Sequence, residues 1–576
     1  MPTVLIRTPH GGPWLELRHP VATIVASRPD GVSAALAGVE QVTRQGYLAA
    51  GFVTYEAAAG FGLPTQPAPR NLPLVWFGVF RAGDAIRHPS VPAGWRDQQG
   101  PLAWRPSIDQ ARYTEAVAGI RQHIADGNTY QLNYTFRMGA DATGDPRTLF
   151  AALADAQGGP WSAFIDTGDL AVCSASPELF FERDGVRIVT RPMKGTAPRG
   201  RWPEEDAARA ESLTASPKNL AENVMIVDLM RNDLGRIARP GSVRVSDMFH
   251  LERYPAQWQM TSTVEAELRP ETTLVEIFAA LFPSGSITGA PKIRSMDILR
   301  QVETGPRGVY CGAVGLVEPG GRAHFNVAIR TVAVDRASGR AEFGVGSGIV
   351  WDSEADAEFE ECRVKATILT TPSPDFSLIE SLRWEPGTGY TLLERHRARL
   401  RDSAAYFGIP FDPLRVETAL TDVASRLTEP SKVRLLVSRA GEVDTAAQPL
   451  GSTPSPMRIA LAPMPVSSQD VWLFHKTTER AAYQTAEAAC PGVDAVLLWN
   501  ERGEVTEATN FNLVAEIDGR RVTPPLDCGL LAGTFRAELL ATGAITEAIV
   551  RVDDLHRATR LWLINSVRGW VEAEQV

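Results

Sequence analysis

The chain has 576 residues, of which 44% are hydrophobic and 22% are charged. One hydrophobic core rarely serves a chain of this length, so we expect a globular protein of two or more domains rather than a disordered or fibrous one. The net charge of −10 argues against a surface that follows nucleic-acid phosphates and favours a small-molecule substrate.

The five cysteines lie far apart and form no CxxC pair, which predicts reduced thiols and a cytoplasmic location. The first residues lack a basic segment followed by a long apolar one, and apolar runs such as 277–282 are too short to span a bilayer. We therefore expect a cytoplasmic enzyme without membrane or nucleic-acid contacts.

Residues 1–370 combine two kinds of hydrophobic pattern. Alternation over 185–193, 324–334 and 340–350 predicts strands, whereas the spacing over 113–127 and 222–237 predicts helices. This mixture is typical of an α+β or α/β domain, and its sheets need not be parallel.

The stretch RPMKGTAPRG, residues 191–200, places Lys194 in a short polar turn. Taken alone, a lysine there is more often surface charge than a catalyst. Glu222 precedes the apolar run 224–230, where a carboxylate can complement the dipole of a helix N-terminus.

Four charged residues near position 360 share one predicted helix face, because Glu354, Glu358, Glu361 and Lys365 are spaced by four, three and four. Such a face is usually solvated and salt-bridged. The alternative is that Glu358 or Glu361 joins Glu222 in binding Mg²⁺, which takes few carboxylates and keeps waters or substrate oxygens.

Two glycine-rich stretches, 282–297 and 343–353, allow backbone amides to approach an anion closely. Their spacings fit neither a Walker loop nor a dinucleotide fingerprint, so a tight turn and a β-bulge remain alternatives. Arg330 lies within a predicted strand, where its planar guanidinium would suit a carboxylate.

Eight motifs occur in the order seen in chorismate-utilising enzymes, which residues 100–370 therefore resemble: QLNYT, SPELFF, MKGT, AENVMIVDLMRNDLG, FPSGSITGAPK, RGVYCGAVG, FNVAIRT and GSGIVWDSEADAEFEECRVKA. Upstream, residues 51–63 resemble the amino-terminal part of aminodeoxychorismate synthase component I. The resemblance implies an anthranilate synthase component I-like fold of stacked antiparallel sheets with helices. It also implies Mg²⁺-dependent displacement of the chorismate C4 hydroxyl.

The resemblance also implies roles for individual residues. It assigns Mg²⁺ to Glu222 and Glu361 with Glu358 in support, the chorismate carboxylates to Arg330, Gly346, Gly348 and Lys365, further substrate contacts to Ser286 and Thr288, and the acid beside the departing hydroxyl to Glu178.

The residue at the position of Lys194 differs between the groups of chorismate-utilising enzymes that this chain resembles. Anthranilate synthases carry alanine at this position of the motif, whereas in aminodeoxychorismate synthases a lysine amine attacks C2 and ammonia then enters at C4. Isochorismate-forming relatives use a lysine as a base toward water. Gln259 stands where many relatives have histidine, and glutamine cannot change protonation near neutral pH, so Glu178 takes more of the acid–base role.

Residues 371–377 contain two prolines and predict a linker to a second domain at 378–576, with lobes at about 378–462 and 470–576. Lys476 ends an apolar, strand-like segment in this domain, where it could also be ordinary edge-strand protection. The motifs WLFHKTTERAAY, NERGEVTEATNFNLV and VTPPLDCGLLAGTFRAELL resemble fold-type IV pyridoxal-phosphate enzymes, which include aminodeoxychorismate lyase and branched-chain aminotransferases.

This second resemblance implies that Lys476 binds pyridoxal 5'-phosphate covalently and moves a proton, that Glu507 pairs with the pyridine nitrogen, and that Arg399, Gly533 and Thr534 hold the phosphate. Phe535 precedes Arg536 where the usual pattern has the arginine directly, so backbone amides are expected to contribute more than that side chain.

The two resemblances predict a bifunctional enzyme that converts chorismate and ammonia into 4-aminobenzoate. The cysteines lack a glutaminase context, so a separate glutaminase subunit is expected to supply the ammonia, and relatives of the second domain suggest a homodimer. The alternatives are an isochorismate- or anthranilate-forming first domain joined to an aminotransferase, or one half kept as a regulatory or scaffolding module.

Overall fold

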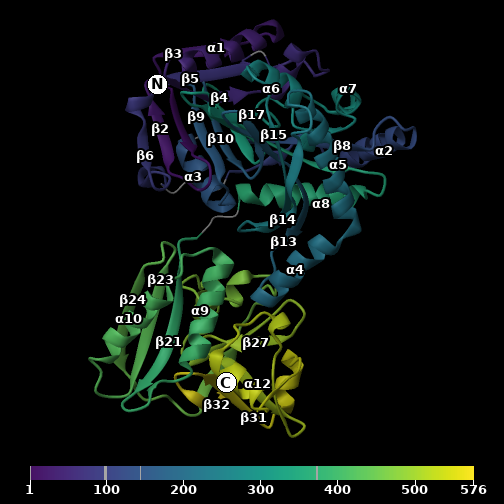
Figure 1. Ribbon diagram of the computed structural model, residues 1–576. Helices are drawn as coiled ribbons and strands as arrows, with labels where there is room; N and C mark the ends of the chain where they lie inside the picture. Colours follow the sequence, from purple (N-terminus) through teal and green to yellow (C-terminus); the bar gives the residue numbers. More distant parts are fainter. Residues whose placement is uncertain (1, 70, 97–99, 101, 143, 371–373) are drawn as a thin grey trace. The chain divides into compact units, whose positions relative to one another are not determined.

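The computed structural model describes residues 2–69, 71–96, 100, 102–142, 144–370 and 374–576, and it divides into two compact units (Figure 1). Unit 1 comprises Met1–Arg199 and Arg209–Ser373, and unit 2 comprises Gly200–Ala208 and Pro374–Val576. Residues 371–373 of the predicted linker lie outside the described residues. The sequence did not predict that 200–208 would belong to unit 2.

Unit 1 contains two large sheets in which every strand pairing is antiparallel. The first runs β16 (Gly289–Ala290), β8 (Gln131–Asp141), β20 (Arg340–Ile349), β19 (Thr331–Asp335), β10 (Leu170–Ser176), β9 (Trp161–Asp166), β1 (Thr3–Arg7), β2 (Trp14–Arg18), β6 (Ile86–His88), with β7 (Arg105–Pro106) beside β8. The second runs β13 (Met193–Pro198), β15 (Gln257–Glu267), β12 (Arg187–Arg191), β11 (Leu179–Asp184), β18 (Ala323–Val327), β17 (Ala313–Val317), β4 (Tyr47–Val53), β5 (Val75–Arg81), β3 (Ala22–Ala26), with β14 (Arg244–Arg253) beside β15.

The helices of unit 1 begin at well-formed caps. Asp109 accepts a hydrogen bond from the Arg112 amide, Ser216 caps a helix that opens with proline, and Thr273 with Glu276 forms a capping box. The helices are α1 (Val32–Arg44), α2 (Gln110–Ala125), α3 (Pro146–Gln157), α5 (Pro217–Gly235), α6 (Leu274–Leu281), α7 (Lys292–Val302) and α8 (Ala355–Ala366), and α4 (Pro203–Ala215) has residues in both units.

The two sheets of unit 1 pack face to face, and helices cover their outer faces (Figure 1). The side chains of β4 alternate between the two cores that this packing creates. Leu48, Ala50 and Phe52 face the first sheet, whereas Ala49 and Val53 lie in the core beneath α1, α5 and α6. The predicted stacked antiparallel sheets with helices are confirmed.

Unit 2 contains two further sheets. The smaller runs β22 (Gly389–Tyr390), β21 (Ser377–Glu385), β23 (Ser431–Ser438), β24 (Val443–Pro449), and the larger runs β27 (Val505–Ala508), β26 (Ala495–Trp499), β25 (Met457–Leu461), β32 (Gly569–Gln575), β31 (Arg560–Asn565), β28 (Asn512–Ile517), β29 (Arg520–Thr523), β30 (Thr546–Glu547). The helices are α9 (Leu393–Phe407), α10 (Pro413–Ala424), α11 (Ala481–Ala489) and α12 (Thr534–Ala541). This is a fold-type IV aminotransferase-like domain.

Three local expectations need correction. β25 lies in the larger sheet because it pairs in parallel with β26 and β32, so the second lobe starts before residue 457. Val471–Leu473 form a 3-10 turn rather than a strand, because the Asp470 side chain accepts from the Trp472 amide. Arg330 lies between β18 and β19 with a left-handed φ of 50° instead of within a strand. None of the described helices is long and apolar enough to cross a membrane.

Candidate active sites

Lys194 of unit 1 lies on β13, where the pairing with β15 changes register between Met193 and Thr196. Gly195 adopts a left-handed φ of 94° at this irregularity, a conformation that glycine takes without strain. Gln259, on β15, donates from Nε2 to the Gly195 carbonyl over 2.9 Å. Gln259 therefore fixes the turn that directs Lys194, instead of serving as the acid–base group that a histidine could provide.

Burial lowers the pKa of Lys194, since desolvation disfavours the charged amine. Glu222, Glu361 and Glu178 oppose this shift, whereas Lys365 adds to it. These groups come from separate elements: α5, α8 and the residue just before β11. The fold thus brings together the acids and lysines that the sequence had placed in distant motifs.

Glu178 is 2% exposed, and burial raises its pKa to about 7, with Ser286 and Lys194 opposing the shift. The Ser286 hydroxyl donates to Glu178 Oε1 over 2.5 Å. A carboxyl group with this pKa is partly protonated near neutral pH and can donate a proton to a departing hydroxyl. Ser286 therefore lies beside the predicted acid.

The carboxylates predicted for Mg²⁺ differ in their surroundings. Burial raises the pKa of Glu222, and Glu358 and Glu361 raise it further, so the three acids repel one another. Burial alone would raise the pKa of Glu361, but Lys365, whose Nζ lies 2.5 Å from Glu361 Oε1, lowers it. Glu358 is buried and accepts from the Ser353 hydroxyl.

This donor set suits a hard divalent cation, because clustered carboxylates are relieved by positive charge. Within the described residues, no three His, Cys, Asp or Glu side chains meet closely enough to form a complete protein cage. Mg²⁺ bound by Glu222 and Glu361 would therefore take its remaining ligands from water and substrate. The magnesium site stays a prediction.

Arg330 and Lys365, two of the residues predicted to bind the chorismate carboxylates, donate hydrogen bonds to other parts of the protein. The Arg330 guanidinium donates to the backbone of Lys365 and to Gln257 and has no ion pair among the described residues. Lys365 donates to the Gly346 carbonyl over 3.0 Å. Thr288, predicted as a further substrate contact, donates its hydroxyl to the carbonyls of Ser284 and Gly285 within its own turn.

Gln131, at the start of β8, is a site residue to which the sequence analysis gave no role. Gln131 is 1% exposed, and neither atom of its side-chain amide has a hydrogen-bond partner among the described residues. A methyl group built on Gly348 would lie 2.5 Å from Gln131 Nε2 and 2.8 Å from Lys194 Nζ, so the amide and the amine border the same point. The only signal in the sequence was its place in the QLNYT motif.

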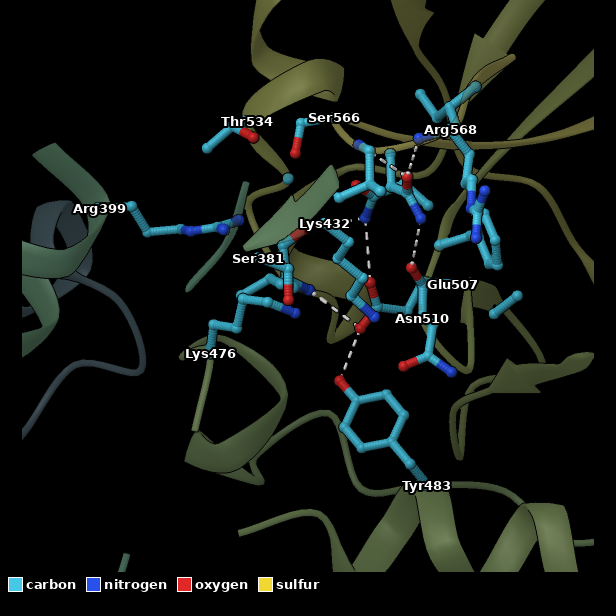
Figure 2. A pocket seen from close by; sticks show the side chains of 18 of the residues that line it. Ser381, Arg399, Lys432, Lys476, Tyr483, Glu507, Asn510, Thr534, Ser566 and Arg568 are labelled. Carbon is cyan, nitrogen blue, oxygen red and sulfur yellow. Dashed lines mark hydrogen bonds between the residues drawn. The ribbon is translucent and has the colours of Figure 1, made fainter. Parts of the chain in front are cut away.

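Unit 2 holds a cavity of about 310 Å³ (Figure 2). Every residue predicted to bind pyridoxal phosphate lines it: Arg399, Lys476, Glu507, Gly533 and Thr534. Burial lowers the pKa of Lys476 to about 8, and the nearby Arg399 lowers it too. The Lys476 carbonyl accepts from the Ile379 amide, which fixes the backbone that carries the amine.

Glu507 is buried deeply enough that desolvation raises its pKa to about 7. Tyr483 donates to its Oε1 over 2.6 Å (Figure 2), and Asn512 donates to its Oε2 over 3.0 Å. Glu507 is therefore suited to pair with a protonated pyridine nitrogen. The positive charge of that nitrogen would favour the carboxylate form of Glu507.

The residues predicted to hold the phosphate also line this cavity. Arg399 pairs with Glu380 over 2.6 Å, and this pairing helps lower the pKa of Glu380 to about 2. Gly533 precedes α12, and a Cβ there would lie 1.9 Å from Asn512 Oδ1, so no side chain fits. Arg536 instead points to Pro524 and Glu547, outside the cavity. The residues present therefore fit pyridoxal phosphate.

Three further cations line the same cavity, and the sequence analysis missed all of them. Arg480 stacks over the Tyr483 ring at 4.2 Å, and Arg568 donates to the Gly451 carbonyl. Burial lowers the pKa of Lys432, and Arg568 adds to the shift. None of the three forms an ion pair with a described residue. The alternation of buried and more exposed residues along β23 was the one sequence signal for the position of Lys432, and no sequence pattern indicated that Arg568 lines the cavity.

Comparisons with known proteins agree with both halves. Residues 13–371 match the family model described as chorismate binding enzyme, and residues 377–576 match that described as amino-transferase class IV. Aminodeoxychorismate synthase component 1 of Klebsiella aerogenes is 42% identical over 259 residues, covering 45% of this chain and 57% of that protein.

Other relatives carry a different name at nearly the same similarity. Anthranilate synthase component 1 1 of Haloarcula marismortui is 41% identical over 257 residues, covering 45% of this chain and 52% of that protein. The solved anthranilate synthase component I from Streptococcus pneumoniae TIGR4 is 27% identical with a TM-score of 0.54, covering 63% of this chain and 93% of that one. The chain spans about half the length of these two curated relatives. Overall identity therefore does not choose between the two names.

Gly348→Ala should strongly impair the chemistry predicted for unit 1 while leaving the unit folded. The added methyl would meet only the ends of two flexible side chains, Gln131 and Lys194, which can move at small cost in stability. We expect an unchanged melting temperature with a loss of chorismate turnover of about 100-fold. A variant that unfolds, or one that retains full turnover, would contradict this geometry.

Lys476 should capture pyridoxal phosphate at a lower pH than an ordinary lysine. Only the neutral amine reacts, so the initial rate of capture by the apoprotein should rise with pH and level off above about 8, rather than above 10.5. Visible absorbance of the bound cofactor gives the rate. A rate that keeps rising up to pH 10.5 would show that burial does not shift this amine.

Proposed function

The chain belongs to the chorismate binding enzyme family, and we propose that it makes 4-aminobenzoate in two steps. Unit 1 converts chorismate and ammonia into 4-amino-4-deoxychorismate, and unit 2 cleaves that compound to 4-aminobenzoate and pyruvate. One observation carries the proposal: each unit holds a lysine with a lowered pKa near a buried acid whose pKa is about 7.

In the first step, the neutral Lys194 amine forms a bond to C2 of chorismate. The two ring double bonds shift, the C4–O bond breaks, and Glu178 gives its proton to the departing hydroxyl, which leaves as water. Ammonia then bonds to C4, the double bonds shift back, and the C2–N pair returns to Lys194. The new ammonium group returns one proton to Glu178, so chorismate and ammonia give aminodeoxychorismate and water.

Mg²⁺ supports this step through charge. Glu222 and Glu361 would hold the ion against the ring carboxylate of the substrate, and Arg330 and Lys365 would bind the remaining carboxylate oxygens. The ion supplies positive charge where the substrate is most negative. The residues then orient the ring with its C2 toward Lys194.

In the second step, pyridoxal phosphate supplies an electron sink. Glu507 would keep the pyridine nitrogen protonated, and Arg399 with the turn at Gly533 and Thr534 would hold the phosphate. Lys476 removes the proton from C4 of the substrate. The enolpyruvyl C–O bond then breaks, the ring becomes aromatic, and the enol takes up a proton to become pyruvate.

The cations of unit 2 favour this lyase over an ordinary amino-acid aminotransferase. Once Arg399 and Lys476 are assigned to the cofactor, three cations remain: Lys432, Arg480 and Arg568. A simple amino acid brings one carboxylate, whereas aminodeoxychorismate brings two. The surplus of positive charge supports a dicarboxylate substrate.

The partners follow from the same chemistry. A glutaminase subunit would supply ammonia, since the homologues named component 1 imply a second component. We propose a cytoplasmic homodimer that associates through unit 2. Light scattering that finds a monomer with full lyase activity would refute the dimer.

Two lysine variants test the reaction order. With chorismate, ammonium and Mg²⁺, the full chain should release 4-aminobenzoate. Lys194→Ala should lower the amination rate by about 10³-fold, because it removes the nucleophile, and Lys476→Ala should accumulate aminodeoxychorismate. Each variant retains the other reaction as its control, measured by chromatography of the products. Release of isochorismate or anthranilate by the unaltered chain would refute the proposal.

Lys432→Ala tests the choice of lyase. Loss of one charged hydrogen bond to the substrate should raise the KM for aminodeoxychorismate by about tenfold. Cofactor absorbance should persist, because every residue assigned to the cofactor is unchanged in this variant. Arg434→Ala is the matched control, since Arg434 is exposed on the same strand and does not line the cavity. Equal KM values for the two variants would favour a monocarboxylate substrate.

A further inference from the structure

Gln131 is a buried amide without a protein partner next to the catalytic amine. Its side chain is 1% exposed, and both its Nε2 and its Oε1 lack hydrogen bonds within the described part of the chain. Buried polar groups are nearly always paired, because an unpaired one loses the hydrogen bonds of water without replacement. An amide in this state is poised for a ligand.

The backbone around Gln131 determines where this amide lies. The Thr129 hydroxyl donates to the Gln131 carbonyl over 2.9 Å, and Gln131 pairs with Ala290 of β16. On the adjoining strand β20, Gly348 offers no side chain, which leaves the amide next to Lys194 Nζ. The register of the sheet thus sets the face on which the Gln131 side chain lies, next to Lys194.

The charges nearby indicate the kind of ligand. Arg330 and Lys365 suit carboxylates, and Glu222 and Glu361 suit a cation. Gln131 is neutral and offers both a donor and an acceptor, so it suits a small neutral molecule. The proposed amination needs such a molecule near Lys194. Lys194 bonds to C2 of the ring, and ammonia then bonds to C4 of the same ring as Lys194 leaves.

We propose that Gln131 binds the ammonia that attacks C4. The amide oxygen accepts one N–H of ammonia and leaves the nitrogen lone pair free for the ring. A carboxylate here would instead stabilise ammonium, which has no lone pair to donate. This proposal rests on the proposed function of unit 1.

Gln131→Leu tests this in the full chain with ammonium chloride, Mg²⁺ and chorismate, and without a glutaminase. Loss of the hydrogen bond should raise the KM for ammonia by about tenfold and leave the KM for chorismate unchanged. The melting temperature should not fall, because an apolar side chain replaces unpaired polar atoms. A raised KM for chorismate alone, or no change in either KM, would overturn the proposal.

Gln131→Glu is the second variant, because it keeps the shape of the side chain. Its carboxylate should hold ammonium, so kcat should fall by about tenfold or more while the KM for total ammonia does not rise. Unchanged kcat in this variant would also overturn the proposal. Gln157→Leu is the matched control, a buried glutamine on α3, and should alter neither KM.

The two proposals fail in different ways. If the unaltered chain forms no aminodeoxychorismate from chorismate and ammonia, the proposed function is wrong. If it does form that product and Gln131→Leu has an unchanged KM for ammonia, only the role of Gln131 is wrong.

Discussion

Both sites depend on removing a lysine amine from water. Desolvation is the largest cause of the lowered pKa of Lys194 and of Lys476, and it is also the largest cause of the raised pKa of Glu178 and Glu507. Burial acts in opposite directions on amines and carboxyls, so one physical effect favours the neutral amine and the protonated acid. The two units reach this state with unrelated folds.

The folds supply the burial by different local means. In unit 1, a glycine at a break in strand register directs Lys194 toward β20, where Gly348 leaves room for its amine. In unit 2, a 3-10 turn is followed by the short segment that carries Lys476, and the Ile379 amide holds that segment by its carbonyl. Small departures from regular structure therefore position both amines, which is common where a side chain must be aimed.

The sequence predicted the elements that rest on local pattern and the residues that lie in recognisable motifs. The helices at 113–127 and 222–237 lie where it indicated, and the five residues that it assigned to the cofactor line one cavity of unit 2. It could not predict features that depend on distant segments. Gln131 became notable only when its neighbours left both amide atoms unpaired, and Lys432 only when Arg568 came near it. The 3-10 turn before Lys476 depends on one side chain, Asp470, which alternation of apolar residues does not reveal.

The central claim is that Lys194 attacks carbon rather than activating water. Mass spectrometry of protein quenched after mixing with chorismate and Mg²⁺, without ammonia, tests this most directly. A peptide containing Lys194 should gain the mass of chorismate less one water, and the corresponding peptide of Lys194→Ala should show no such gain. An unmodified peptide together with isochorismate in solution would contradict this claim and would make Lys194 a base toward water.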